Sequence, residues 1–124
     1  MDRPNTELVS TVLGGPDPIG LARFYRDLLG WEITYEDPTW VKLRRPDTGT
    51  GLSFQLEEEH VPPVWPSGDG DQQMQMHLDV WVEDVETGVA RAIGLGATLA
   101  ESQPQEDVRV MLDPAGHPFC LFAG

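Results

Sequence analysis

The side chains with the widest chemical range in this 124-residue sequence are three histidines and one cysteine. His77 and Cys120 both lie in strand-like segments, and both residue types serve as metal ligands and in nucleophilic catalysis. A nucleophilic Cys120 would need a base, and His77 is the one that the inferred organisation brings near it. The same pair could hold zinc, but two ligands do not complete a zinc site. His60 has no implied partner in its Pro-rich segment, and we interpret His117, in a turn, as structural.

Each of these residues also has a simpler interpretation. A histidine in a strand is often a hydrogen-bonded residue of a core or pocket, and Cys120 can be a small buried apolar side chain. Gln55 can orient a ligand amide or carbonyl, or it can satisfy backbone groups. The sequence therefore predicts a polar site around His77 without identifying a catalytic residue.

Two amphipathic helices are predicted, over Pro18–Leu29 and Val85–Leu95. Asp17 and Asp84 are suitable N-caps, and each segment ends at a glycine. Three further strand-like runs follow each helix. They cover Trp31–Glu36, Trp40–Arg44 and Gly51–Glu57 in the first half, and Ala97–Gln103, Val108–Leu112 and His117–Ala123 in the second.

The two halves of the chain repeat the same order of elements. A strand-like segment precedes each helix, Leu8–Leu13 in the first half and Met76–Val82 in the second. Aligning the two helix caps makes Ser10 and His77 equivalent positions of the repeat. Aligning the closing strands, Gly51-Leu52-Ser53-Phe54-Gln55-Leu56 and Gly116-His117-Pro118-Phe119-Cys120-Leu121, places Gln55 on Cys120. We therefore predict one domain over residues 1–124, an α+β protein with βαβββ modules at 6–57 and 74–124 and a linker at 58–73.

The alternation of residues along the predicted strands selects one face for these polar side chains. Successive side chains of a strand point to opposite faces, so His77, Asp79 and Trp81 share a face from which Leu78 and Val80 point away. The repeat extends the same orientation to Ser10, and alternation on the closing strands extends it to Gln55 and Cys120.

This order of motifs resembles the vicinal-oxygen-chelate superfamily, the glyoxalase, bleomycin-resistance and dioxygenase proteins, and within it the glyoxalase-like subgroup. The resemblance covers nearly the whole chain. Its markers are Pro16-Asp17-Pro18, the run Phe24-Tyr25-Arg26-Asp27-Leu28-Leu29-Gly30-Trp31, His77-Leu78-Asp79-Val80, Gly94-Leu95-Gly96-Ala97 and Asp113-Pro114-Ala115-Gly116-His117-Pro118-Phe119. The resemblance implies two modules in a pseudo-twofold arrangement, a curved cup-like mixed sheet that holds the ligand, and a homodimer.

Metal-dependent members of this superfamily bind one divalent ion through the first and last strands of each module. Carried over, those positions are Ser10, Gln55, His77 and Cys120. No carboxylate is among them, and a catalytic site for a hard divalent ion needs carboxylates and imidazoles. We therefore expect no cofactor and no catalytic metal; if an ion binds, its ligands would be His77, Gln55 and Cys120. We expect all four positions, with Asp79 and Trp81, to contact a ligand in one pocket.

Charge and composition restrict the partners. The formal net charge is −13, with 21 acidic residues against 8 Lys and Arg, so a nucleic acid would be repelled and a cationic ligand attracted. The acidity can also serve solubility alone. No apolar run is long enough to span a membrane, no apolar region follows Met1–Asn5, and the single cysteine fits a reducing compartment. These features predict a cytoplasmic protein.

Three functions follow from this sequence. The first is binding of a small cationic or aromatic ligand without a metal, as in the antibiotic-sequestering branch of the family. The second is a metal-dependent enzyme, a glyoxalase-type lyase, an epimerase or an extradiol dioxygenase. The third is a non-catalytic module that acts through a partner protein. The four tryptophans favour the first, and we expect Trp65, within Pro62-Pro63-Val64-Trp65-Pro66, near the dimer interface or acting as a lid.

Overall fold

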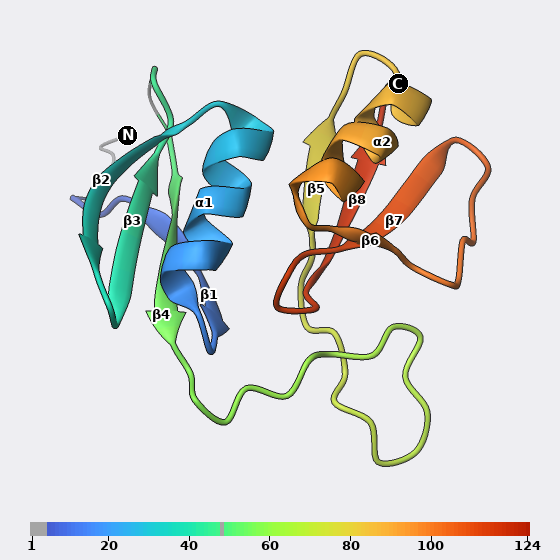
Figure 1. Cartoon of the computed structure of the whole chain (residues 1–124), viewed down its shortest axis with the longest axis horizontal. Coiled ribbons are helices and arrows are strands. Elements are labelled where there is room, and N and C mark those ends of the chain that lie inside the picture. Colours follow the sequence, from blue (N-terminus) through green and yellow to red (C-terminus); the bar gives the residue numbers. More distant parts are fainter. Residues whose placement is uncertain (1–4, 48) are drawn as a thin grey trace.

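The computed structural model describes residues 5–47 and 49–124, so Met1 to Pro4 and Thr48 of the predicted domain lie outside the described residues. The first module contains β1 (Ser10–Gly15), α1 (Pro18–Leu29), β2 (Glu32–Asp37), β3 (Trp40–Arg44) and β4 (Gly51–Leu56). The second contains β5 (Leu78–Trp81), α2 (Val85–Leu95), β6 (Thr98–Leu99), β7 (Val108–Leu112) and β8 (Pro118–Phe122). The modules lie side by side, and the linker runs between them (Figure 1).

Each module forms its own four-stranded mixed sheet, and the two sheets have the same topology. The strand orders are β1-β4-β3-β2 and β5-β8-β7-β6, with the first pair parallel and the others antiparallel in each. The predicted α+β fold of two βαβββ modules is confirmed. The strands of one chain form two curved sheets, and neither β1 nor β5 pairs with the other module.

Both helices have the predicted bounds because their caps form as expected. The Asp17 side chain accepts a hydrogen bond from the Gly20 amide at 3.1 Å, and Asp84 accepts one from the Thr87 amide at 2.9 Å. Gly30 ends α1 in the left-handed conformation.

Three predicted strands differ from the structure. The first begins at Ser10 instead of Leu8, and the fifth is confined to Leu78–Trp81, so that His77 lies one residue before it. The segment Ala97–Gln103 forms only the two-residue strand β6. Downstream of β6, the Gln103 side chain makes the hydrogen bonds that a neighbouring strand would make with β7. It donates to the carbonyl of Val110 and accepts from the Val110 amide, both at 2.9 Å.

One apolar core joins the two modules. Helix α1 supplies the largest share, and its aromatic residues contact Phe54 of β4 and Phe119 of β8. The buried residues of this core are Leu21, Ala22, Phe24, Tyr25, Leu28, Val41, Leu43, Leu52, Phe54, Ala92, Ala97, Met111, Phe119 and Leu121. Since each sheet turns one face to this core, the opposite face of each sheet is left for other contacts.

Candidate functional site

A large hollow lies on the face of the second sheet that points away from the core. Its volume is about 670 Å³, within the range of small-molecule sites. Strands β7 and β8, the segment before β5, the 104–107 loop and the linker all contribute to its wall. The lining residues are Trp65, His77, Asp79, Val85, Pro104, Gln105, Asp107, Val108, Val110, Cys120, Phe122, Ala123 and Gly124.

Three predicted site residues meet at one end of this hollow. His77 Nε2 lies 3.1 Å from Asp79 Oδ1, and both side chains lie next to the Cys120 thiol. Burial, reinforced by the negative charge of Asp79, raises the pKa of Cys120 above its ordinary value. The thiol is therefore held in its neutral form, which argues against a ready nucleophile.

The linker supplies a further wall through Trp65. Its indole stacks on the His77 ring, with centroids 5.0 Å apart and planes at 25°. The proximity of Trp65 to His77 could not be read from the alternation of residues, because Trp65 belongs to no strand. Asp107 was also missed, because it precedes β7 in a loop that carries no periodic pattern.

The other predicted residues lie elsewhere in the chain. Ser10 borders a separate hollow of about 250 Å³ on the first sheet, where its hydroxyl is 2.7 Å from that of Ser53. Gln55 is exposed and donates to Glu57. Trp81 is 61% exposed and does not line the large hollow. Within one chain, then, Ser10 and Gln55 do not share a hollow with His77 and Cys120, and their predicted convergence would need a second copy of the chain.

The two hollows differ in charge. The large one carries the carboxylates of Asp79 and Asp107, and none of the described residues that line it is a Lys or Arg. The small one carries Lys42 and Arg44, and within the described part of the chain no Asp or Glu lines it. The hollow on the second sheet is therefore acidic, and the hollow on the first sheet is basic.

We tested whether these residues suit a metal ion. The ligand atoms of His77, Asp79 and Cys120 all lie within 4.8 Å of one another. Two ligands of a tetrahedral zinc ion are about 3.3–3.8 Å apart, so a small side-chain movement would bring the three onto one ion. One imidazole, one carboxylate and one thiol suit zinc better than magnesium or manganese. Asp79 takes the place in this set that the sequence had given to Gln55.

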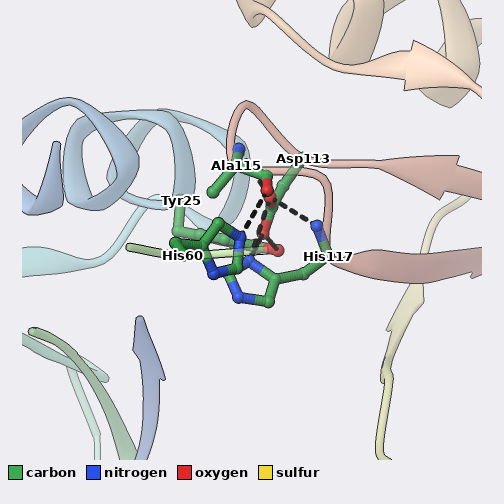
Figure 2. Close-up of polar contacts among 5 residues, drawn as sticks. All are labelled: Tyr25, His60, Asp113, Ala115 and His117. Atoms are coloured by element: carbon green, nitrogen blue, oxygen red, sulfur yellow. Dashed lines mark hydrogen bonds and ion pairs between the residues drawn. The ribbon is translucent and has the colours of Figure 1, made fainter. Parts of the chain in front are cut away.

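A second polar cluster lies away from this hollow and joins three parts of the chain (Figure 2). The carboxylate of Asp113 is fully buried; it accepts a 2.7 Å hydrogen bond from the Tyr25 hydroxyl and lies 3.0 Å from His117 Nδ1. His60 of the linker meets the Ala115 carbonyl through Nε2 at 2.8 Å, and its ring lies 5.0 Å from that of His117. This cluster fixes the linker to the turn between β7 and β8.

The fold class of the chain is thus α+β, with two paired βαβββ modules that each have an open concave face. The glyoxalase-like domain family matches residues 10–122, and the chain is a member of that family. No curated protein matches the sequence significantly. In the part of the chain that the structure describes, neither helix has the length and apolarity needed to cross a membrane.

Solved structures share the fold at low identity. A glyoxalase/bleomycin resistance protein/dioxygenase family enzyme from Burkholderia phytofirmans PsJN has a TM-score of 0.70 and 19% identity, over 94% of this chain and 97% of that one. A glyoxalase-related enzyme from Fulvimarina pelagi has a TM-score of 0.68 and 20% identity, over 95% and 88%. The bleomycin-binding protein of Streptomyces verticillus, complexed with copper(II)-bleomycin, has a TM-score of 0.56 and 20% identity, over 98% and 99%.

Proposed function

We propose that this protein binds a small cationic, aromatic molecule in the hollow of the second sheet, without a catalytic metal. The observation that carries the proposal is the composition of the hollow. Its wall is mostly apolar, two carboxylates lie on it, and none of the described residues that line it is a Lys or Arg. A cation gains most from Asp79, next to His77, whereas an anion would meet the negative charge of both carboxylates.

Aromatic side chains favour a flat ligand. Trp65 and Phe122 both line the hollow, and an indole face attracts a planar cation through its quadrupole. His77 supplies a polar group beside them, as is usual in a largely apolar site with a few fixed polar groups. The Streptomyces verticillus protein, which has the same fold, is described as bleomycin-binding, and this lends support to ligand binding within the fold.

We also propose that the working form is a homodimer in which the first sheet of one copy faces the second sheet of the other. The basic hollow with Lys42 and Arg44 complements the Asp107 carboxylate of the loop before β7, and Asp79, next to His77, is left for the ligand. Strands β1 and β5 each pair with one neighbour only and so leave an edge for a second chain. This arrangement would bring Ser10 of one copy toward His77 and Cys120 of the other, and it would place the linker at the interface.

The binding proposal can be tested with two flat probes of opposite charge. N-methylacridinium should bind with saturable quenching of Trp fluorescence, and acridine-9-carboxylate should not. Replacing His77 with Ala should weaken acridinium binding by roughly fivefold, about what the loss of a ring contact with the flat probe would cost. Tyr35→Ala is the control, because Tyr35 is an exposed aromatic residue of β2 that lies outside the hollow.

Metal analysis of the same samples completes the test. We expect no stoichiometric metal in the wild type and no change in His77→Ala. The proposal fails if the purified protein carries close to one equivalent of zinc, nickel or iron that His77→Ala removes. Equal binding of both probes would refute the preference for cations.

A metal-dependent enzyme is the second candidate, favoured by the proximity of His77, Asp79 and Cys120. A zinc ion there would supply Lewis-acid chemistry, by polarising a carbonyl or activating a bound water. These three residues would hold it and leave one position open to a substrate. A zinc ligand must be the thiolate, so binding of the ion would release the proton of the Cys120 thiol.

A further inference from the structure

The linker between the modules is an ordered loop that brings one tryptophan back onto the second sheet. A bridge between Val64 and Gln73 closes the neck of the loop, and the Val64 amide donates to the Gln72 carbonyl at 2.7 Å. At its tip the Gly68 amide donates to the Asp71 carboxylate at 2.8 Å. Trp65 is the first residue beyond the neck, so its indole is placed by the ordered part of the loop.

The other end of the linker is fastened to the turn between β7 and β8. His60 contacts the Ala115 carbonyl and the His117 ring, as Figure 2 shows. Two residues later, Pro62 packs so closely against Gly116 that a Cβ atom on Gly116 would lie 2.7 Å from the Pro62 Cβ. The linker is thus fixed before the neck, while the loop beyond it is exposed.

Trp65 separates two hollows on the same face of the protein. The larger one, of about 670 Å³, holds His77, Asp79 and Cys120. The other, of about 310 Å³, is lined by Trp65, Pro66, Ser102, Pro104 and Val110. Both hollows share Trp65, Pro104 and Val110, so they adjoin at Trp65.

The Trp65 indole packs outside the buried core. Its one described ring contact is the stack on His77, and the residue is 36% exposed. Because the side chain belongs to neither of the buried clusters, it can change position without disturbing the core.

We propose that Trp65 is the specificity-determining residue of the hollow, a movable partition that rests on His77 in the free protein. A compact molecule fits beside the seated indole. A large flat molecule that reaches Asp79 and Cys120 must displace the indole toward the smaller hollow, where it then stacks against the ligand. The proposal rests on the hollow being the binding site, but the position of the indole can be tested without any ligand.

Cys120 is a suitable reporter because it is the only cysteine of the chain and lies in the wall of the larger hollow. Iodoacetamide and N-(1-pyrenyl)iodoacetamide react with it in the same way: the thiolate forms an S–C bond and iodide leaves. The ratio of the two rates at one pH therefore cancels the ionised fraction of the thiol. That ratio reports how much room a large flat group finds on its way to Cys120.

We expect Trp65→Ala to raise the ratio of the pyrenyl rate to the iodoacetamide rate by at least about fivefold. Trp65→Phe, which keeps a stacking ring, should stay close to wild type. Tyr35→Ala removes an exposed aromatic ring from β2, outside the hollow, and should leave the ratio unchanged. Far-ultraviolet circular dichroism establishes that each variant is folded.

Two results would overturn the partition. One is an unchanged ratio in Trp65→Ala; the other is an equal rise in both rates, which would report general loosening around Cys120. If the ratio rises as expected while N-methylacridinium does not bind, the partition stands and the proposed ligand class is wrong.

Discussion

Asp113 shows how much of this molecule depends on a single side chain. Its carboxylate is fully buried and accepts hydrogen bonds from the Tyr25 hydroxyl and from the amides of Ala115 and His117. Tyr25 belongs to α1 of the first module, and the other donors belong to the turn between β7 and β8. The hydrogen bond from Tyr25 therefore ties one module to the other within the core.

Replacing Tyr25 with Phe should lower the free energy of unfolding by about 1.5–3 kcal/mol, the range for a hydrogen bond to a buried charged group. Urea denaturation at pH 7 measures this loss. Tyr35→Phe is the matched control, because its hydroxyl also donates to an aspartate, Asp37, but on the exposed surface. A loss at Tyr25 no larger than the loss at Tyr35 would contradict this role.

The same contact makes the stability of the fold depend on pH in the alkaline range. Burial, and then the charge and hydrogen bond of Asp113, raise the pKa of Tyr25 well above its ordinary value of 10.0. The folded state thus opposes ionisation of Tyr25, and the stability it contributes is complete below pH 10 and lost as the pH rises further. Wild type should therefore lose more stability between pH 9 and 11 than Tyr25→Phe does.

Among the elements, the linker depends on the turn that receives it. Gly116 has φ of 89°, a conformation that glycine adopts readily, and it faces Pro62 without space for a side chain. Gly30, at the end of α1, has φ of 70° and nothing within 4 Å of where a Cβ atom would stand. The two glycines share a backbone requirement and differ in packing.

This pair makes a matched comparison. Gly30→Ala should lower the free energy of unfolding by about 1–2 kcal/mol, because an alanine is strained in the left-handed backbone conformation. Gly116→Ala should cost roughly 2–4 kcal/mol, because overpacking against Pro62 adds to the same backbone term. Urea denaturation of both variants measures the two losses in the free energy of unfolding. Equal losses would mean that Pro62 moves aside without an energetic penalty.

At the scale of the whole molecule, charge is distributed unevenly between the two concave faces. The chain carries a net charge of −13, yet Lys42 and Arg44 lie on a hollow whose lining, among the described residues, has no Asp or Glu. Long-range repulsion between two such acidic chains would oppose association, so a dimer needs local complementarity to overcome it. In the proposed dimer, the basic hollow of the first sheet would supply that complementarity by facing the second sheet of the other copy.

We expect sedimentation velocity to show a dimer of the wild type at micromolar concentration. Lys42→Glu should shift it toward monomer by placing a carboxylate opposite Asp107 in the proposed dimer. Arg23→Glu makes the same change of net charge on α1, outside both hollows, and should leave the dimer intact. A monomeric wild type, or equal dissociation of both variants, would refute this arrangement.

The sequence by itself determined the repeat, both helices with their caps and the α+β class, because these depend on local periodicity and on cap residues such as Asp17 and Asp84. Strand alternation also predicted one face for His77 and Asp79, and the repeat extended that face to Cys120, which the pairing of β5 with β8 brings next to Asp79. Only the tertiary structure decided that one chain forms two separate concave faces, with Ser10 on one and His77 on the other. The position of Trp65 was likewise a tertiary outcome, because a Pro-rich linker has no periodicity, and its path is set by contacts such as that of His60 with Ala115.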